Sequence, residues 1–248
     1  MSLVSTGFGA LALLAVATAI VLGLRLEHPW LQPWALLRAG VQLGILSVIL
    51  LGVITSGWWV ALFLVAMVCA ASWTVYTRLG LARRTLPFLL ATVALAAAVP
   101  VAVVFATGAV EFSPRYVLAL GGLIVGNVMT VTTLMGRLLG NGLLSSRNEI
   151  EGWLALGATP REAARDVTRA SASSAIIPST DQTRTTGIVT LPGAFVGAVF
   201  GGSSPLMAAQ FQIIVLAAIL CAGAISLAAM TWRFGAPREL PTEAAPLR

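Results

Sequence analysis

The sequence predicts an all-α polytopic membrane protein with about seven transmembrane helices, and three observations lead to this prediction. Of the 248 residues, 58% are hydrophobic and only 10% are charged, whereas about a quarter of the residues in a soluble domain are charged. The apolar stretches run past the length of a core helix, and about 20 such residues cross a bilayer. The basic residues, all of them Arg, are scattered over short connections. Membrane topology therefore explains the net charge of +6 better than nucleic-acid binding does.

Seven apolar segments have the length and composition of membrane-crossing helices. They are approximately Leu3–Leu24, Ala35–Thr55, Gly57–Tyr76, Leu86–Thr107, Tyr116–Met135, Thr186–Gly202 and Leu206–Trp232. The first has no Arg ahead of it, so we expect a retained helix and not a signal peptide. We expect residues 1–235 to form a single transmembrane domain and residues 236–248 to form a short cytoplasmic tail.

The positions of the Arg residues predict the orientation of the chain. If the N-terminus lies outside, fourteen of the fifteen Arg residues fall on the cytoplasmic side or at its edge, and only Arg115 lies outside. The external connections around Ser56, Gly108–Arg115 and Gly201–Pro205 are almost uncharged. The sequence thus predicts seven spans in the cytoplasmic membrane, with the N-terminus outside and the C-terminus in the cytoplasm.

The sixth segment, Thr186–Gly202, is short and is interrupted at Leu191-Pro192-Gly193. The Pro removes a backbone donor and breaks the regularity of the helix. A re-entrant hairpin would place the Arg-bearing tail outside, so we expect a broken span. Broken backbone at membrane depth is tolerated where protein or a water-filled cavity surrounds it. Pro192 and Gly193 are therefore candidates for the lining of a pathway, and a simple packing kink is the alternative.

Residues 136–185, between the fifth and sixth segments, carry a dense group of charges. Eight of the 24 charged residues lie from Arg147 to Arg169. Glu149–Leu156 predicts a short amphipathic helix, and Gly157, which is free to take a positive φ, is expected to end it. The apolar side of this helix consists of Ile150, Trp153, Leu154 and Leu156.

A second helix is predicted to begin at Thr159-Pro160-Arg161-Glu162. This run combines a Thr cap, a Pro at the first helical position and a Glu three residues after the cap. Apolar positions then recur at helical spacing opposite a row of Arg. The apolar positions are Ala163, Ala164, Val167 and Ala170, and the Arg row is Arg161, Arg165 and Arg169. The region is expected to fold as helix, turn and helix on the cytoplasmic side.

A pair of helices lying on the membrane surface would also fit this pattern. A helix that faces anionic lipid favours Arg on its polar side, whereas this polar side mixes acidic and basic residues. Trp153 beside the turn at Gly157 forms a compact apolar projection, and aromatic anchors of this kind dominate protein interfaces. On the residues alone, both a surface helix pair and a docking loop stay open.

Glu151, Gly157 six positions later and the run Leu156-Gly157-Ala158-Thr159 resemble the cytoplasmic coupling loop of ABC-transporter permeases. In that motif a Glu-Ala-Ala segment leads to a Gly, and the short helix inserts into a groove of the ATPase subunit. Here Gly152-Trp153 stands in place of the two Ala. The resemblance implies contact with an ATPase through Glu149, Glu151, Trp153, Leu154, Gly157, Ala158 and Thr159.

A wider ordered set of motifs resembles the FetB-type iron-export permease family, whose plant relatives are linked to aluminium tolerance. The set comprises Arg38-Ala39-x-x-Gln42-Leu43, Gly126-Asn127-x-Met129, Leu156-Gly157-Ala158-Thr159-Pro160, Ile177-Pro178-Ser179-Thr180-Asp181 and Thr186-Gly187-Ile188-Val189-Thr190-Leu191-Pro192-Gly193. The likeness covers about residues 35–235. It implies a metal-exporting permease that pairs with a separate ATPase subunit, as two permeases with two ATPases.

The residues themselves support the need for such a partner. A P-loop requires a Lys that reaches the phosphates of ATP, and this chain contains no Lys. We therefore expect a transport subunit that is not an enzyme, binds no cofactor and depends on ATP used by its partner. An organic cargo such as a sugar nucleotide and a non-transporting scaffold for the ATPase are the alternatives.

Ionisable groups are almost absent from the apolar segments, so polar or helix-breaking residues within them, a soft Met and the carboxylate at the entrance to the sixth segment are candidates for the substrate pathway. The candidates are Gln42, Asn127, Met129, Asp181, Pro192 and Gly193. Asn127 beside Gly126 fits helix packing as well as a pathway. Asp181 could pair with Arg184, cap the N-terminus of the sixth helix, or meet a cation that leaves the cytoplasm.

No metal ligands are assigned. Met67, Cys69 and Met129 are soft donors for a transition metal, but such side chains in apolar helices usually serve packing. The single His28 has no Cys or carboxylate pair beside it.

Overall fold

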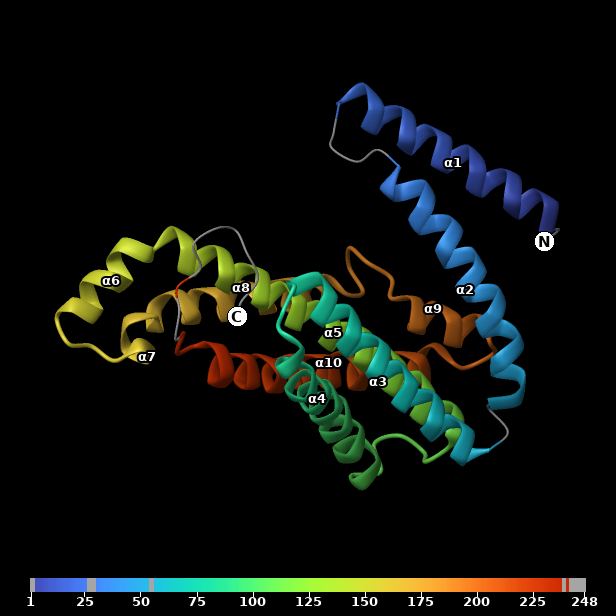
Figure 1. The fold of residues 1–248 in the computed structure, drawn as a ribbon. Helices are drawn as coiled ribbons and strands as arrows, with labels where there is room; N and C mark the ends of the chain where they lie inside the picture. The colour runs from blue at the N-terminus through green and yellow to red at the C-terminus, as the bar shows by residue number, and fades with distance from the viewer. Residues whose placement is uncertain (1–2, 26–29, 54–55, 238–239, 241–248) are drawn as a thin grey trace. The chain divides into compact units, whose positions relative to one another are not determined.

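The computed structural model describes residues 3–25, 30–53, 56–237 and 240, and the chain divides into two compact units, Met1–Ser56 and Gly57–Arg248 (Figure 1). In the first unit, α1 (Leu3–Gly23) contacts α2 (Leu31–Val53). The predictions for His28 and for most of the tail fall outside the described residues.

The second unit is a bundle of long helices with shorter helices between them. Its elements are α3 (Gly57–Leu79), the 3-10 helix η1 (Arg83–Thr85), α4 (Leu86–Ala106), α5 (Pro114–Ser145), α6 (Arg147–Ala155), α7 (Pro160–Ala163), α8 (Arg165–Thr185), α9 (Gly193–Phe200) and α10 (Pro205–Phe234). Within the described residues, α1, α3, η1 with α4, α5 and α10 are long and apolar enough to cross a membrane. The all-α prediction and these five membrane-length segments are confirmed.

Helices α3 and α5 run in the same direction and approach each other closely. Leu64 lies against Gly121, where an added Cβ would stand 2.7 Å from Leu64 Cδ2, and Leu79 lies against Gly136 further along both helices. Glycine at these positions lets the two backbones come together, as small residues do in membrane helix pairs. The whole of α3 therefore lies alongside the first 23 residues of α5.

Helix α10 also runs parallel to α5. Near their first turns, the rings of Tyr116 and Phe211 are 5.4 Å apart. Further along, the buried hydroxyls of Thr132 and Ser226 are 2.7 Å apart and hydrogen-bonded. Because a buried polar group needs a partner, this pair fixes the α5–α10 register inside an otherwise apolar core.

Helix α8 differs most from the sequence prediction, which placed residues 136–185 in a cytoplasmic loop that carries a pair of helices. Helix α5 continues past the predicted end at Met135 to Ser145, and α8 then folds back antiparallel to it. The Ser179 hydroxyl donates to Asn127 Oδ1 at 3.1 Å. Residues 136–185 are thus the end of α5, two short helices and a long helix packed on α5 and α10.

The sixth predicted span, Thr186–Gly202, does not form a membrane-length helix. After α8 the chain makes a tight turn with an isolated bridge between Thr186 and Thr190. Only α9 is helical in this segment, and its eight residues measure about 12 Å, against a bilayer core of about 30 Å. The interruption is confirmed, with Pro192 as the residue that precedes α9, but a span built from this segment alone is wrong.

Candidate functional site

The predicted turn between the two short helices has the geometry of a Schellman motif. Gly157 has a φ of +92°. Its N–H donates to the Leu154 carbonyl at 3.0 Å, and the Ala158 N–H donates to the Trp153 carbonyl at 3.0 Å. These two bonds satisfy carbonyls that α6 would otherwise leave without partners. The prediction that Gly157 ends the helix is confirmed.

The predicted capping box at the start of α7 is also present. The Thr159 hydroxyl accepts from the Glu162 N–H, and the Glu162 carboxylate accepts from the Thr159 N–H at 2.9 Å. The hydroxyl of Thr159, and then its backbone N–H, hold the pKa of the Glu162 carboxyl below its ordinary value of 4.5. The prediction of one continuous second helix is wrong, because the chain breaks at Ala164 and α8 starts at Arg165.

The four apolar residues of α6 and its turn separate into an anchor and a projection. Ile150 is only 1% exposed and belongs to the core cluster of the bundle. Trp153, Leu154 and Leu156 are 52%, 37% and 81% exposed, and we call these three the apolar projection. The turn thus presents apolar side chains away from the core while Ile150 holds α6 in place.

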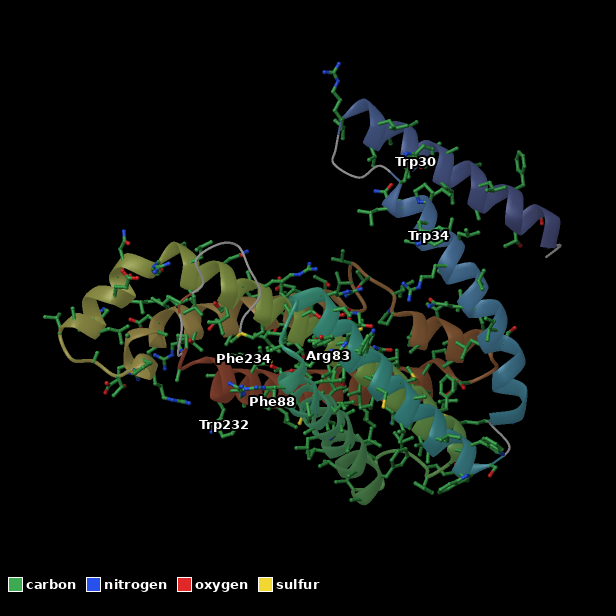
Figure 2. The ribbon with its side chains drawn as sticks, viewed as in Figure 1. Trp30, Trp34, Arg83, Phe88, Trp232 and Phe234 are labelled. Carbon is green, nitrogen blue, oxygen red and sulfur yellow. The ribbon has the colours of Figure 1, made fainter. Side chains whose placement is uncertain are left out.

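The connection α6–α7 is attached to the ends of the long helices. Arg161 Nη2 donates to the Trp232 carbonyl in α10 at 2.9 Å. At the same end the ring of Phe88 in α4 lies 6.5 Å from Trp232 and 5.9 Å from Phe234, and Arg83 precedes α4 in η1 (Figure 2). Aromatic and basic side chains of this kind are typical of the edge of a membrane span.

The acidic candidates of this region are exposed. Glu149 is exposed, and Glu151 forms an ion pair with Arg147 at 2.7 Å. A surface i,i+4 pair of this kind contributes about 0.3–0.5 kcal/mol, so a partner protein can displace it at little cost in stability.

The Arg row is confirmed as one surface, since Arg161, Arg165 and Arg169 line the same hollow of about 550 Å³.

Replacement of Thr159 with Ala removes the hydroxyl that accepts from the Glu162 N–H and donates to the Glu162 carboxylate. We expect it to destabilise the start of α7 by about 1 kcal/mol. Hydrogen exchange at the backbone amides of residues 161–164, followed in detergent, would measure this loss, with Thr159→Ser as the matched control that keeps the hydroxyl. Because folding lowers the pKa of Glu162, its contribution is present above pH 4.5 and is lost as the pH falls through the folded value. The difference between wild type and Thr159→Ala should therefore shrink below pH 4.5; a pH-independent difference would contradict the role of Glu162.

The pathway candidates of the second unit do not form one cluster in the structure. Asn127 is half-buried and bonded to Ser179, which supports helix packing. Met129 packs between the two core clusters, and Gln42 is exposed on α2 in the first unit. Pro192 and Gly193 form the start of α9. Sequence reasoning did not identify Ser179, because its partner lies 52 positions away.

Asp181 lies inside α8, one turn before the helix ends at Thr185. Its predicted role as an N-cap is therefore wrong, since a cap precedes a helix. Its side chain and that of Arg184 are exposed. Within the described part of the chain, no three His, Cys, Asp or Glu side chains gather as a metal site.

Comparison with known proteins identifies relatives over nearly the whole chain. The family described as "Uncharacterised protein family (UPF0014)" matches residues 6–236. UPF0014 membrane protein STAR2 of Oryza sativa subsp. japonica is 34% identical over 219 residues, covering 88% of this chain and 77% of that protein. Probable iron export permease protein FetB of Escherichia coli (strain K12) is 32% identical over 223 residues, covering 88% and 85%. Protein ALUMINUM SENSITIVE 3 of Arabidopsis thaliana is 38% identical over 121 residues, covering 49% and 44%. No solved structure matches the chain.

Proposed function

The chain belongs to the UPF0014 family of membrane proteins, and from this premise we propose that it is the membrane subunit of an ABC transporter that exports a metal ion. A separate ATPase supplies the energy, and the transporter contains two copies of each subunit. Iron is the proposed cargo, because a relative that matches 88% of this chain is named a probable iron export permease.

The observation that carries this proposal is the exposed apolar projection beside a rigid turn. A coupling element must present a side chain to a groove of the ATPase and must resist being pushed aside. Trp153 is half exposed next to the Schellman turn at Gly157, and aromatic residues are the usual anchors of such interfaces. Buried Ile150 and the capping box keep the projection in one position.

The contacts of α6 and α7 with the bundle support the transmission of movement from the ATPase to the long helices. Ile150 packs in the same cluster as Met230 of α10 and Leu89 of α4. Arg161 bonds to the last turn of α10. Movement of α6 and α7 on closure of the ATPase would therefore displace the ends of α4 and α10 together, and rigid-body shifts of packed helices are a common switching mode.

The proposed orientation places the α6–α7 end of the bundle in the cytoplasm. The Arg bias of the connections supports it, and the aromatic and basic side chains of Phe88, Trp232 and Arg83 mark that edge of the bundle. The ATPase, which is soluble, would then meet the projection at the cytoplasmic face of the cell membrane.

Transport in proteoliposomes tests this function directly. The chain is reconstituted with a candidate ATPase subunit, and we expect ATP-dependent accumulation of iron in vesicles whose α6–α7 end faces outward. A P-loop Lys variant of the ATPase is the control for coupling. Movement of a sugar nucleotide in place of iron would overturn the cargo and keep the ABC assignment. Binding of the ATPase without movement of any cargo would indicate a scaffold.

A further inference from the structure

Asp181 lies level with the middle of the apolar helices α3 and α5. The stretch of α5 beside α3 is 114–136, because Leu64 and Leu79 stand against Gly121 and Gly136. Helix α8 runs antiparallel with Ser179 opposite Asn127. Asp181 is two residues further, so it is level with about residue 125, the centre of that stretch.

The register of α8 on α10 gives the same depth independently. A Cβ on Gly223 would stand 2.8 Å from Ile176 Cδ1, so these two residues are level. Asp181 is five residues beyond Ile176 and is level with about residue 218, close to the middle of Pro205–Phe234. Two helices that are apolar enough to cross a membrane therefore place this carboxylate at mid-depth.

The part of α8 at this depth is polar and exposed. Residues 178–185, with the sequence PSTDQTRT, contain no apolar side chain other than the Pro ring. Ser179 and Ala175 face the bundle and are buried. Asp181 and Arg184, three positions apart and therefore on one face, are exposed. Lipid would be a costly neighbour for both charges, and ionisable groups at this depth face protein or water.

The segment that follows α8 leads from the middle of the bundle to the end at which α10 starts. The backbone turns over Thr186–Pro192, where the Gly187 N–H donates to the Thr190 carbonyl at 2.8 Å and Gly187 has a φ of +86°. Helix α9 continues beside α10 for about 12 Å, and α10 then starts after a short loop (Figure 1). Non-helical backbone at this depth is tolerated where it lines a water-filled cavity or is surrounded by protein.

We propose that α8, the turn and α9 form one discontinuous membrane crossing, and that its Asp181–Arg184 face meets the same face of a second copy around a hydrated path for the cargo. This inference rests on the proposed transporter function and places Asp181, already a pathway candidate from the sequence, inside a membrane crossing together with Arg184. The partner copy completes the site, because the unit Gly57–Arg248 by itself leaves both charges exposed.

The charges on the face support a second copy as the occupant. In a two-fold interface each copy presents the same patch to the other, so Asp181 of one copy faces Arg184 of the other, and the reverse. The face is self-complementary in charge and neutral as a whole. Carboxylate and hydroxyl oxygens along it, those of Asp181 and Thr180, are the donors that a hard cation prefers.

Cysteine accessibility in native membranes, with the ATPase co-expressed, tests both parts of this inference. In a parent with Cys69 and Cys221 replaced by Ser, Cys is introduced by Asp181→Cys or Ile177→Cys on the proposed face. Leu95→Cys is the matched control, because Leu95 is 59% exposed at the middle of α4. A charged, membrane-impermeant thiol reagent needs water and the thiolate. We expect the first two variants to react at least about tenfold faster than the control, and to form cross-linked dimers on mild oxidation.

Each outcome separates the possibilities. Labelling at the rate of the Leu95→Cys control would overturn the hydrated path. Fast labelling without dimers would overturn the second copy as the occupant of the face. If loss of Asp181 prevents folding, labelling and cross-linking can still be measured with the Ile177→Cys variant, which keeps Asp181. ATPase co-purification with the parent reports on the proposed function separately, because labelling and cross-linking do not require bound ATPase.

Discussion

Replacement of Gly157 with Ala is expected to weaken binding of the ATPase by about 5–30-fold, whereas the same replacement at Gly152 is expected to leave binding intact. Gly157 has a φ of +92°. An L side chain at a left-handed backbone position costs roughly 1–2 kcal/mol. The Schellman turn would therefore open, and the apolar projection would lose its fixed position. Co-purification or a titrated pull-down of the ATPase measures the change.

Gly152 is a matched control because it lies five positions earlier in the same connection. Its backbone is helical, and an added Cβ would meet nothing within 4 Å. Ala there should stabilise α6 by roughly 0.5–1 kcal/mol, and it restores one Ala of the coupling motif. Gly157→Asn should lie between wild type and Gly157→Ala, since Asn tolerates left-handed backbone. Equal binding by all three variants would remove the turn from the coupling mechanism.

Replacement of Gly136 with Leu should destabilise the bundle by roughly 1–3 kcal/mol or more. Leu79 of α3 already occupies the space beside Gly136, and Leu79 is only 6% exposed. A larger side chain must push α3 away from α5 or force both side chains off their preferred rotamers. Thermal aggregation of the detergent-solubilised protein, followed by size-exclusion chromatography, measures the loss.

The comparison variant is Gly126→Leu on the same helix. An added Cβ at Gly126 would meet nothing within 4 Å, so we expect its stability to stay close to wild type. Gly136→Ala should fall between the two, because the tips of the Leu79 side chain can move to accept one methyl group. Similar losses from Leu at both glycines would mean that helix propensity and not the α3–α5 approach determines the effect.

Local signals in the sequence were sufficient for the connection α6–α7. The Thr159 cap, Pro160 and Glu162 occur within four residues, and the bonds that they form are local. The turn at Gly157 is similar, because the Gly157 N–H bonds three positions back to Leu154 and the Ala158 N–H bonds five positions back to Trp153. Local hydrogen bonding of this kind is determined by short-range sequence. The exposure of Trp153 was also predicted, whereas the burial of Ile150 in the core cluster depends on residues far away in sequence.

The pathway residues could not be placed by the same reasoning. Hydropathy averages a window and assigns a polar stretch such as 178–185 to a loop. In the structure this stretch is helical, and hydroxyls such as that of Thr183 bond back to the carbonyl four residues earlier. Close approach at Gly223 and the bond from Ser179 to Asn127 then hold α8 against the bundle.

The sequence by itself determined that this is an all-helical membrane protein with a capped, Gly-terminated connection carrying an exposed Trp. These features depend on composition, on apolar length and on neighbours within one or two helical turns. Only the tertiary structure decided that α8 packs beside apolar helices and brings Asp181 level with their centre. The physical reason is that the position of a polar helix depends on glycine gaps and hydrogen-bond partners on other helices, which lie dozens of residues away in the chain.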